Sequence, residues 1–338
     1  MTNIVLFGGA SDERHVSVAS AQNIARTLGS PAPLCWFWTP DGAVHDVALA
    51  ELLAHQRPFE RDFHPSRPAI WPTLEQALDT LPVDDPLFVL ALHGGAGEDG
   101  TVQRMMERRG IAFTGSGSEA SAAAFDKGRA KEMVRGRLNV AESRVVHDPR
   151  DLDRVARELL ERHERVVLKP VAGGSSRGLY FVGRGDAIPQ VSVPYIVEQY
   201  LAGRELTVGV IDQGDGPFAL PVIEIETDPG FTFDYAGKYL GYGTREICPA
   251  RIPDALRDAA QRAATTAHTA LGCEGYSRTD LIAIGDAEVY FLELNTLPGL
   301  TTSSLVPQEL KEAGIGFREF LERQIELARG RVAHVAGA

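Results

Sequence analysis

Tyr276-Ser-Arg-Thr-Asp-Leu-Ile-Ala-Ile-Gly-Asp-Ala-Glu-Val-Tyr-Phe-Leu-Glu-Leu-Asn-Thr-Leu-Pro-Gly299 is the stretch of sequence that decides the fold. Apolar β-forming residues on both sides of Gly285-Asp286-Ala287 predict two strands joined by a tight turn. With a two-residue turn, Asp280 lies opposite Glu293, with Cβ atoms roughly 5 Å apart. Asn295 then points the same way as Glu293, because side chains alternate along a strand.

This pairing predicts a cation site. Two like charges that face each other beside apolar surface are unfavourable unless a cation lies between them. Oxygen ligands from two carboxylates and one amide suit a hard ion such as Mg²⁺. Two alternatives stay open: a solvated acidic hairpin without metal, and a three-residue turn that separates Asp280 and Glu293 to opposite faces. The apolar residues expected on the face of the carboxylates are Ile282, Ile284, Val289 and Phe291.

Composition bounds the class of protein. A chain of 338 residues is long enough for two or three domains. The net charge of −12 argues against a nucleic-acid partner, and a polyanionic ligand would need local Lys or Arg side chains or bound metal. The sequence has no signal-peptide pattern and no apolar stretch near the ~20 residues that span a bilayer, which predicts a cytoplasmic protein without membrane contact. Three scattered cysteines, Cys35, Cys248 and Cys273, fit free thiols in a reducing compartment.

Two glycine loops follow predicted strands in the first third of the chain. Residues 3–7 form a buried strand that leads through Gly8-Gly9 into a helix at 16–28, and residues 87–92 deliver His93 into another glycine-rich loop. Ligands gather where strand carboxyl ends meet helix N-termini. Ser11 or Asp12 is the expected N-cap, with Glu13 pointing toward the ligand. Simple turn geometry for the glycines and a structural role for His93 are the alternatives.

The middle of the chain carries the expected phosphate contacts. Residues 118–135 predict one long Ala-rich helix that contains Lys127. Lys169 ends a strand before the glycine-serine loop 171–178, which suits a mobile flap whose N–H groups and hydroxyls cover phosphates. An ordinary hairpin turn is the alternative, and Lys169 favours phosphate. The aromatic, glycine-rich segment 231–243 predicts an ordered lid.

The order of these motifs resembles the D-alanine–D-alanine ligases of the ATP-grasp superfamily, from Gly8 to about Leu327. The resemblance implies an α/β (α+β) ATP-grasp fold of three domains with nucleotide between the last two. Residues 1–120 would form an N-terminal open parallel-sheet domain for substrate, 121–200 a central domain with the flap, and 201–338 a catalytic domain with lid and metal site. The matching segments are residues 8–17, 92–101, 114–117, 126–127, 169–178, 233–239, 278–280, 293–299 and 304–305.

The resemblance also implies a role for each candidate residue. Two Mg²⁺ ions, or Mn²⁺, would be held by Asp280, Glu293 and Asn295. ATP would be bound by Lys127, Lys169, Ser175, Ser176, Glu198, Glu205 and Lys238. The amino-acid substrates would be bound by Glu13, His93, Arg278, Ser304 and Leu305, and the catalytic set would be Glu13, Ser175, Tyr239, Arg278 and Gly299.

The implied reaction joins two D-alanines through an acyl phosphate, for peptidoglycan precursor synthesis, in a homodimeric enzyme. The sequence departs from the family's usual pattern at His15, where an acid is common, at Ala236, where the lid usually has Glu, and at Arg177 in the flap. The first two departures lie near the expected substrate end. They leave open the same chemistry on another small amino acid or a hydroxy acid, and a catalytically silent nucleotide-binding protein is a further alternative.

Overall fold

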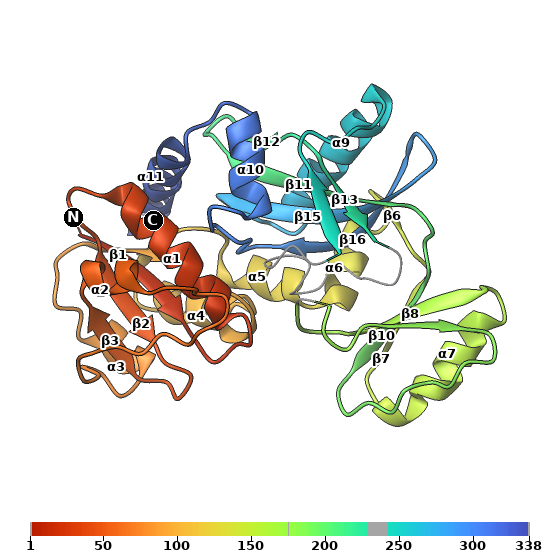
Figure 1. Cartoon of the computed structure of the whole chain (residues 1–338), viewed down its shortest axis with the longest axis horizontal. Helices are drawn as coiled ribbons and strands as arrows, with labels where there is room; N and C mark the ends of the chain where they lie inside the picture. Colours follow the sequence, from red (N-terminus) through yellow and green to blue (C-terminus); the bar gives the residue numbers. More distant parts are fainter. Residues whose placement is uncertain (1, 175, 229–242, 337–338) are drawn as a thin grey trace.

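The computed structural model describes residues 2–174, 176–228 and 243–336. Within them the strands form three sheets with helices packed against them, a mixed α/β architecture (Figure 1). The first sheet has the order β3-β2-β1-β4-β5 and is parallel except at β3, which pairs antiparallel with β2 at the edge. Its strands are β1 (Thr2–Gly8), β2 (Leu34–Trp38), β3 (Val44–Val47), β4 (Pro86–Leu90) and β5 (Ala112–Phe113).

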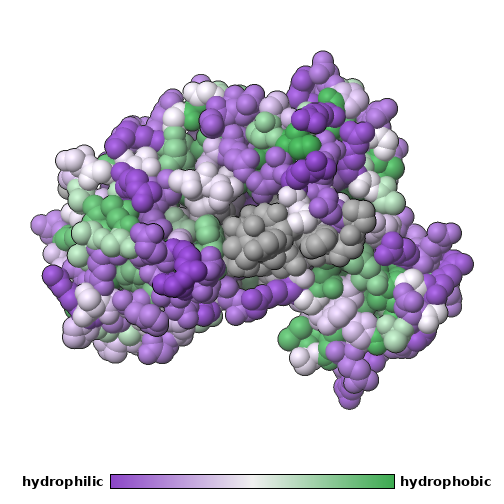
Figure 2. Space-filling view, in the orientation of Figure 1, coloured by the Kyte–Doolittle hydropathy of each residue, from purple (hydrophilic) through white to green (hydrophobic). Residues whose placement is uncertain are grey.

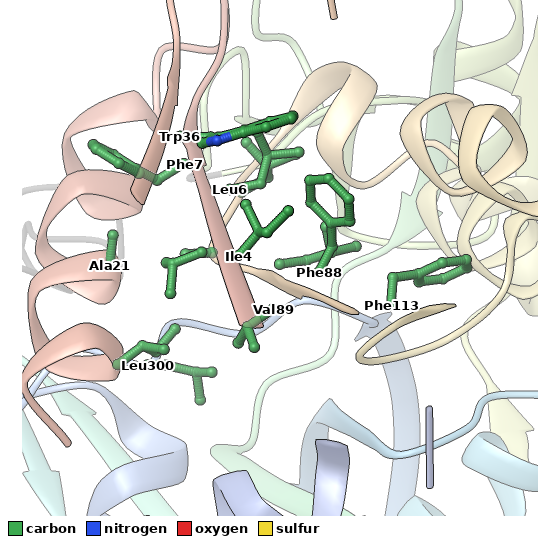
Figure 3. Packing of buried hydrophobic residues seen from close by; sticks show 14 of the residues in the cluster. Ile4, Leu6, Phe7, Ala21, Trp36, Phe88, Val89, Phe113 and Leu300 are labelled. Carbon is green, nitrogen blue, oxygen red and sulfur yellow. The ribbon is translucent and has the colours of Figure 1, made fainter. Parts of the chain in front are cut away.

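The first sheet is surrounded by short connections and helices. They are α1 (Arg14–Leu28), α2 (Leu49–Ala54), α3 (Leu74–Asp79), the short 3₁₀ turn η1 (Gly95–Gly97) and α4 (Thr101–Glu107). Runs of apolar residues in β1 and β4 are buried on both faces, as expected for parallel strands between helices. This core also includes Leu300, from the loop that follows the hairpin of residues 276–295, called here the opening hairpin (Figure 3). The N-terminal sheet and the far end of the chain therefore share one hydrophobic core.

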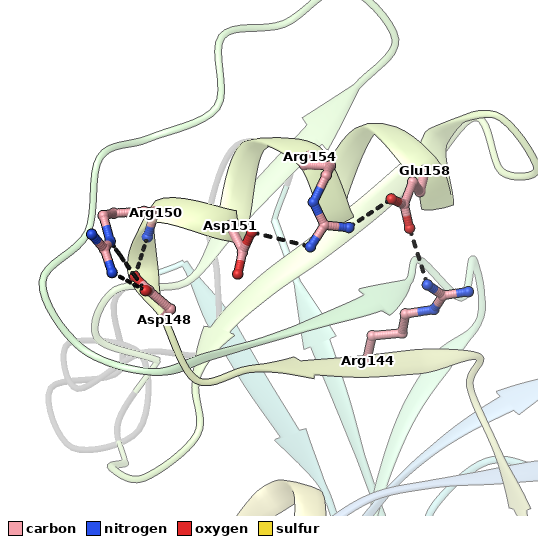
Figure 4. Close-up of polar contacts among 6 residues, drawn as sticks. All are labelled: Arg144, Asp148, Arg150, Asp151, Arg154 and Glu158. Atoms are coloured by element: carbon pink, nitrogen blue, oxygen red, sulfur yellow. Dashed lines mark hydrogen bonds and ion pairs between the residues drawn. The ribbon is translucent and has the colours of Figure 1, made fainter.

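The second sheet is antiparallel and forms a separate lobe in Figure 1. Its order is β7-β10-β8-β9, with β7 (Ser143–Val146), β8 (Arg165–Pro170), β9 (Tyr180–Gly183) and β10 (Tyr195–Gln199). The turn η2 (Pro149–Asp151) leads into α7 (Leu152–Leu160), whose apolar side packs on this sheet. The outer side of α7 carries a chain of exposed ion pairs (Figure 4).

The third sheet contains the opening hairpin at its centre. Its order is β14-β13-β11-β15-β16-β6, and β12 pairs with β11. The strands are β6 (Asn139–Val140), β11 (Arg204–Asp212), β12 (Pro217–Ala219), β13 (Ile223–Thr227), β14 (Thr244–Ile247), β15 (Tyr276–Ile284) and β16 (Glu288–Asn295). Helix α9 (Asp254–Ala270) covers one face, and α10 (Leu305–Glu312) and α11 (Phe317–Ala336) follow the hairpin.

The prediction of one long helix at 118–135 is wrong, because the helix is interrupted at Asp126. This residue has an extended backbone, and its side chain accepts a hydrogen bond from the N–H of Arg129 at 3.0 Å. An N-cap of this kind starts a new helix. The segment is therefore two helices, α5 (Ser118–Phe125) and α6 (Lys127–Val134), and the break places Lys127 at the first turn of α6.

Two elements cross the predicted domain boundaries. Strand β6 lies in the predicted central segment but pairs with β16 of the third sheet. Helix α11 belongs to the last segment but packs against β5 and α1 of the first sheet. No helix in the described ranges is long and apolar enough to cross a membrane. Figure 2 shows polar and charged side chains over most of the face in view, with smaller hydrophobic patches among them.

Candidate active site

The hairpin β15–β16 brings Asp280 and Glu293 face to face, as the sequence predicts. The turn, however, has three residues, because β15 ends at Ile284 and β16 begins at Glu288. Gly285 opens it with a φ of 63°, a left-handed conformation that favours glycine. Such a turn alone would separate the two carboxylates to opposite faces.

A β-bulge restores the pairing. The register passes from Leu281 opposite Phe291 to Asp280 opposite Glu293, so Leu292 is an extra residue in β16. An extra residue on one strand reverses the alternation of its side chains beyond the bulge. The prediction that Phe291 and Val289 share the face of the carboxylates is therefore wrong. Phe291 packs in the core beneath α6, and Val289 packs in the core beneath α9.

Asp280 is buried and held by two neighbours. The Arg278 guanidinium donates to both of its carboxylate oxygens, with Nε–Oδ1 at 2.9 Å and a terminal nitrogen at 2.7 Å from Oδ2. The hydroxyl of Thr207, from the adjacent strand β11, donates to Oδ1 at 2.6 Å. A forked Arg–carboxylate pair is geometrically specific, so the orientation of Asp280 is fixed from two sides.

Asn295 completes the predicted ligand set and lies opposite Arg278 in the hairpin. Its Oδ1 accepts the N–H of Leu297 at 2.9 Å, which holds the side chain in place. Glu293 contributes a carboxylate on the face of Asp280 that is about one-third exposed. Asp280 and Glu293 line the same pocket, whereas Asn295 lies two residues further along the strand and does not line it. Two carboxylates and one amide are nevertheless a donor set whose chemistry fits Mg²⁺. Groups of three or more His, Cys, Asp or Glu that could hold a metal do not occur in the described parts of the chain.

A pocket of about 800 Å³ lies between the second and third sheets, with Asp280 and Glu293 in its wall. Pockets of this size hold small-molecule ligands and cofactors. The predicted ATP contacts Lys127, Lys169, Ser176, Glu198 and Glu205 all line it. The apolar side chains that line the pocket include those of Val167, Leu179, Phe181, Leu201, Ile282 and Leu292.

Two lysines, Lys127 and Lys169, line this pocket. The Nζ of Lys127 lies 3.3 Å from Oε2 of Glu293 and donates to the carbonyl of Gly173 in the flap at 2.7 Å. The Nζ of Lys169 lies 3.0 Å from Oε2 of Glu198. Burial would lower the pKa of Lys169, but the nearby Glu198 and Glu293 carboxylates outweigh burial and raise it. Lys169 therefore stays cationic where a polyanion would bind.

Glu198 is almost completely buried between two lysines. Its Oε1 lies 3.2 Å from the Nζ of Lys131, which is not among the predicted site residues. Burial would raise the pKa of Glu198, but Lys131 and Lys169 outweigh burial and lower it, so the carboxylate is ionised. Its predicted role in binding ATP stays a prediction.

The flap and the first glycine loop meet at Glu13. A side chain at Gly94 or at Gly174 would approach Oε2 of Glu13 to 2.9 Å, so both glycines give the backbone room to approach this carboxylate closely. The expected N-cap is wrong by one or two residues, because Glu13 itself is the N-cap of α1 and its side chain makes no capping hydrogen bond. Arg177 of the flap pairs with Asp12 of the same loop. The flap thus lies against the N-terminal loop.

His93 joins the first domain to the loop after the hairpin. It is buried, and its Nε2 lies 3.0 Å from the hydroxyl of Ser20 in α1. The N–H of Leu300 donates to the same hydroxyl at 3.2 Å. His93 does not line the large pocket. It lies instead in a network that leads to Leu300, next to Gly299 of the predicted catalytic set.

Ser304 and Leu305 begin α10, beside this loop. Ser304 is the N-cap, and its hydroxyl lies 2.7 Å from that of Thr301 and accepts the N–H of Thr301 at 3.1 Å. Leu305 is buried. The N-terminus of a helix favours a carboxylate, which agrees with the predicted role of these residues.

Four predicted or flagged residues lie outside the described residues. They are Ser175 of the flap and Ala236, Lys238 and Tyr239 of the lid segment. Their roles stay predictions. Two buried residues that the sequence did not reveal, Thr207 and Lys131, belong to the site instead. Lys131 follows Lys127 by one helical turn, a spacing that was available as a signal, whereas the contact of Thr207 depends on strand pairing.

Comparisons with known proteins agree with this architecture. The family model described as "D-ala D-ala ligase N-terminus" matches residues 2–116, and that described as "D-ala D-ala ligase C-terminus" matches residues 148–326. A D-alanine–D-alanine ligase of Syntrophobacter fumaroxidans is 38% identical over 339 residues, covering 97% of each chain. One of Geobacter sulfurreducens is 37% identical, covering 94% of this chain and 91% of the relative.

Solved structures are also similar. The VanG D-Ala:D-Ser ligase of Enterococcus faecalis superposes with a TM-score of 0.79 at 29% identity, covering 97% of this chain and 99% of that one. A D-alanine–D-alanine ligase of Bacillus anthracis gives a TM-score of 0.74 at 26% identity, with 99% of both chains covered. The predicted ATP-grasp fold is confirmed. With both family models matched and relatives of this similarity over nearly its whole length, the chain belongs to the D-alanine–D-alanine ligase family.

Proposed function

We propose that this protein is an ATP-dependent ligase that joins two D-alanines to D-alanyl-D-alanine for peptidoglycan precursor synthesis. One observation carries the proposal. Asp280 faces Glu293 beside the buried Arg278, in the wall of a pocket that also presents Lys127 and Lys169. This arrangement supplies charge neutralisation and alignment, which are the main demands of phosphoryl transfer.

Different residues of the site bind the nucleotide and the two amino acids. On the nucleotide side, Lys127 and Lys169 neutralise phosphates, Ser175, Ser176 and Lys238 contribute further contacts, and Glu198 and Glu205 hold the nucleoside. On the amino-acid side, Glu13 receives the ammonium of the first D-alanine, and His93 supports the loop that carries Gly299. The start of α10, with Ser304 and Leu305, receives the carboxylate of the second.

The chemistry proceeds in two steps. A carboxylate oxygen of the first D-alanine attacks the γ-phosphorus of ATP, and the bond from that phosphorus to the β-phosphate oxygen breaks, giving an acyl phosphate and ADP. The amine of the second D-alanine, having lost a proton, attacks the carbonyl carbon, and inorganic phosphate leaves. Arg278 and the N–H of Gly299 stabilise the oxyanion that forms between attack and departure. Ser175 and Tyr239 join Glu13 in closing the site against water, which would hydrolyse the acyl phosphate.

Enzymes of this family use ATP with Mg²⁺. We assign two Mg²⁺ ions, replaceable by Mn²⁺, to Asp280, Glu293 and Asn295, whose oxygen donors suit such ions. The bound ions would neutralise charge on the phosphates during transfer. Around them, Arg278 and Thr207 orient Asp280, and Lys127 lies beside Glu293.

We further propose a cytoplasmic homodimer with domains at 1–120, 121–200 and 201–338. Cross-linking or sedimentation of the purified protein tests the dimer. The sheets of the structure support the division, since each lies mainly within one of these segments. Limited proteolysis that cuts near residues 120 and 200 would support the two boundaries.

The decisive experiment measures phosphate release from ATP with Mg²⁺ and D-alanine, with product identified by mass spectrometry. D-alanyl-D-alanine and one phosphate per peptide are expected. Asp280→Ala should abolish turnover without loss of fold, whereas Asp286→Ala, in the exposed turn of the same hairpin, should be fully active. If no phosphate is released with D-alanine, other D-amino acids, L-amino acids or D-lactate, the proposed ligase activity is contradicted. That result would favour a catalytically silent nucleotide-binding protein.

A second candidate is the same chemistry with a different small partner, an amino acid such as D-serine or a hydroxy acid. It is favoured by the surroundings of His15, whose Nε2 lies 2.9 Å from Asp62, which is also bonded to Arg14. Arg14 and His15 follow Glu13 directly in the sequence, and His15 stands where an acid is common in the family. Competition between D-alanine, D-serine and D-lactate as acceptors distinguishes the two candidates. We expect Tyr239→Phe to admit D-lactate, and an unchanged acceptor preference would contradict the role of the lid.

A further inference from the structure

Lys131 is a buried lysine beneath the nucleotide pocket. Its side chain is about 1% exposed, and it does not line the pocket itself. It lies one turn after Lys127 in α6, so the same helix sends one lysine into the pocket and one into the core below it. An ammonium in such a place is costly unless it is paired and hydrogen-bonded.

Two contacts with Phe291 of β16 fix the position of the Lys131 ammonium. It donates to the backbone carbonyl of Phe291 at 3.2 Å and lies 5.8 Å from the centre of the Phe291 ring. Phe291 is the residue just before the bulge at Leu292, where the strand ladder is locally disrupted. The side chain of Lys131 is therefore anchored to the hairpin, below the pocket.

The third contact of Lys131 is with Glu198. The carboxylate of Glu198 lies between the two ammonium groups, 3.2 Å from Lys131 on one oxygen and 3.0 Å from Lys169 on the other. Burial lowers the pKa of Lys131, and the Glu198 carboxylate opposes that shift. With both lysines protonated, these three side chains carry one net positive charge. Without Lys131, Glu198 and Lys169 would form a neutral pair, and Lys169 would have little net charge to offer a phosphate.

We propose that Lys131 is a positioning residue for nucleotide binding, which neutralises Glu198 so that Lys169 faces the triphosphate with a net positive charge. This inference rests on the ATP site proposed above. It explains why a buried lysine lies behind a lysine that lines the pocket. It also gives Glu198 a second role beside its proposed nucleoside contact, which is to pair with both lysines.

The competing explanation is that Lys131 only stabilises the core. Charge and stability can be separated by variants of the full-length protein. Lys131→Met removes the charge with similar volume, and Lys131→Met combined with Glu198→Gln removes one charge of each sign, which returns the net charge of the group to that of the parent. Lys311→Met, on the exposed side of α10, is the control for loss of one lysine.

Binding of ATP and of inorganic tripolyphosphate is measured by isothermal titration calorimetry, and unfolding temperature is measured alongside. Tripolyphosphate has no base, so contacts of Glu198 with adenine do not affect it. We expect Lys131→Met to weaken tripolyphosphate binding on the order of ten-fold or more, from the loss of one charge near the site. The double variant should recover most of that loss, and Lys311→Met should bind like the parent.

Two results would overturn the proposal. One is a folded Lys131→Met variant with the parent's affinity for both ligands. The other is a double variant whose tripolyphosphate affinity is as weak as that of the single variant, which would indicate a structural role alone. If Lys131→Met does not fold, Lys131→Arg and the double variant are tested instead. Both keep the net charge of the three side chains, so both should bind tripolyphosphate within about three-fold of the parent. Failure of the parent to bind ATP would instead contradict the proposed function.

Discussion

The outer side of α7 and the floor of the nucleotide pocket carry the same kinds of residue in opposite surroundings. On α7, Arg154 bridges Asp151 and Glu158 in a chain of alternating charges that faces solvent (Figure 4). On the pocket floor, Glu198 bridges Lys131 and Lys169 with almost no exposure. Both are networks of a central charge with a partner on each side.

The two networks differ in how strongly they affect stability and ligand binding, because one is exposed and the other is buried. Exposed ion pairs gain little because water and salt screen them and two long side chains must be ordered. Buried charges depend on their partners, because removing one leaves the other without water or counter-ion. We therefore expect substitutions in the α7 network to have little effect on stability. Loss of a charge at Glu198, Lys131 or Lys169 should instead affect folding or ligand binding.

The largest expected effect is on catalysis, at the other buried pair of the site. Arg278→Lys keeps the positive charge but loses the fork that holds both oxygens of Asp280. We expect kcat to fall by about 10²–10³, the usual cost of one oxyanion donor. Steady-state phosphate release measures this, with circular dichroism to verify the fold. A variant that retains more than about a tenth of the parent kcat would contradict the role of Arg278.

The next effect is on stability, at the centre of the pocket-floor network. Glu198→Ala removes the carboxylate that pairs with both Lys131 and Lys169, which leaves the buried Lys131 without its ion-pair partner, and we expect a loss of about 3–5 kcal/mol. Urea unfolding measures it. Glu158→Ala, at an equivalent bridging position on α7, is the matched control and should change stability far less. Equal losses in the two variants would show that burial is not what separates the networks.

Some features of the site were predictable because they depend on local pattern. The pairing of Asp280 with Glu293 was predicted from alternation along two strands, and it is present. The turn has three residues and not the predicted two, and the extra residue Leu292 in β16 compensates for the difference. A bulge has no sequence signature in this hairpin comparable to the glycine of the turn.

Other features depend on contacts between distant segments. The break at Asp126 was hidden by an Ala-rich composition that favours continuous helix, while the side-chain cap that produces it was overlooked. The link from His93 through Ser20 to Leu300 joins three segments far apart in the chain. The fold was predictable through the order of many motifs, and the supporting contacts around the site required coordinates.

A smaller effect, dependent on pH, is expected at Glu309 in α10. This carboxyl is fully buried, and one oxygen accepts the N–H of Gly209 at 2.7 Å. Burial raises its pKa well above the usual 4.5, although the Gly209 hydrogen bond and Arg278 oppose the shift. Above about pH 4.5 the unfolded chain loses this proton while the folded chain keeps it, so stability falls as pH rises until the folded pKa is passed.

Glu309→Gln removes that titration and tests its direction. The variant should match the parent near pH 4 and become the more stable protein as pH increases, by about 1.4 kcal/mol for each unit by which burial raises the pKa. Urea unfolding of both proteins at several pH values gives the difference directly. Parallel stability curves from pH 4 to pH 8 would show that Glu309 ionises in the folded protein as easily as in the unfolded chain.

The smallest effect is expected on α7, and it closes the comparison with the pocket floor. Arg154→Ala removes both ion pairs of the central arginine, at 3.1 Å from Asp151 and 2.7 Å from Glu158. Because these groups are exposed, the unfolding temperature should change by less than about 2 °C, and alanine's high helix propensity offsets part of the loss. The remaining difference should vanish in about 1 M salt, where screening acts over only about 3 Å. A fall of more than about 5 °C that persists in that salt would place this network with the buried one, and exposure would no longer distinguish the two.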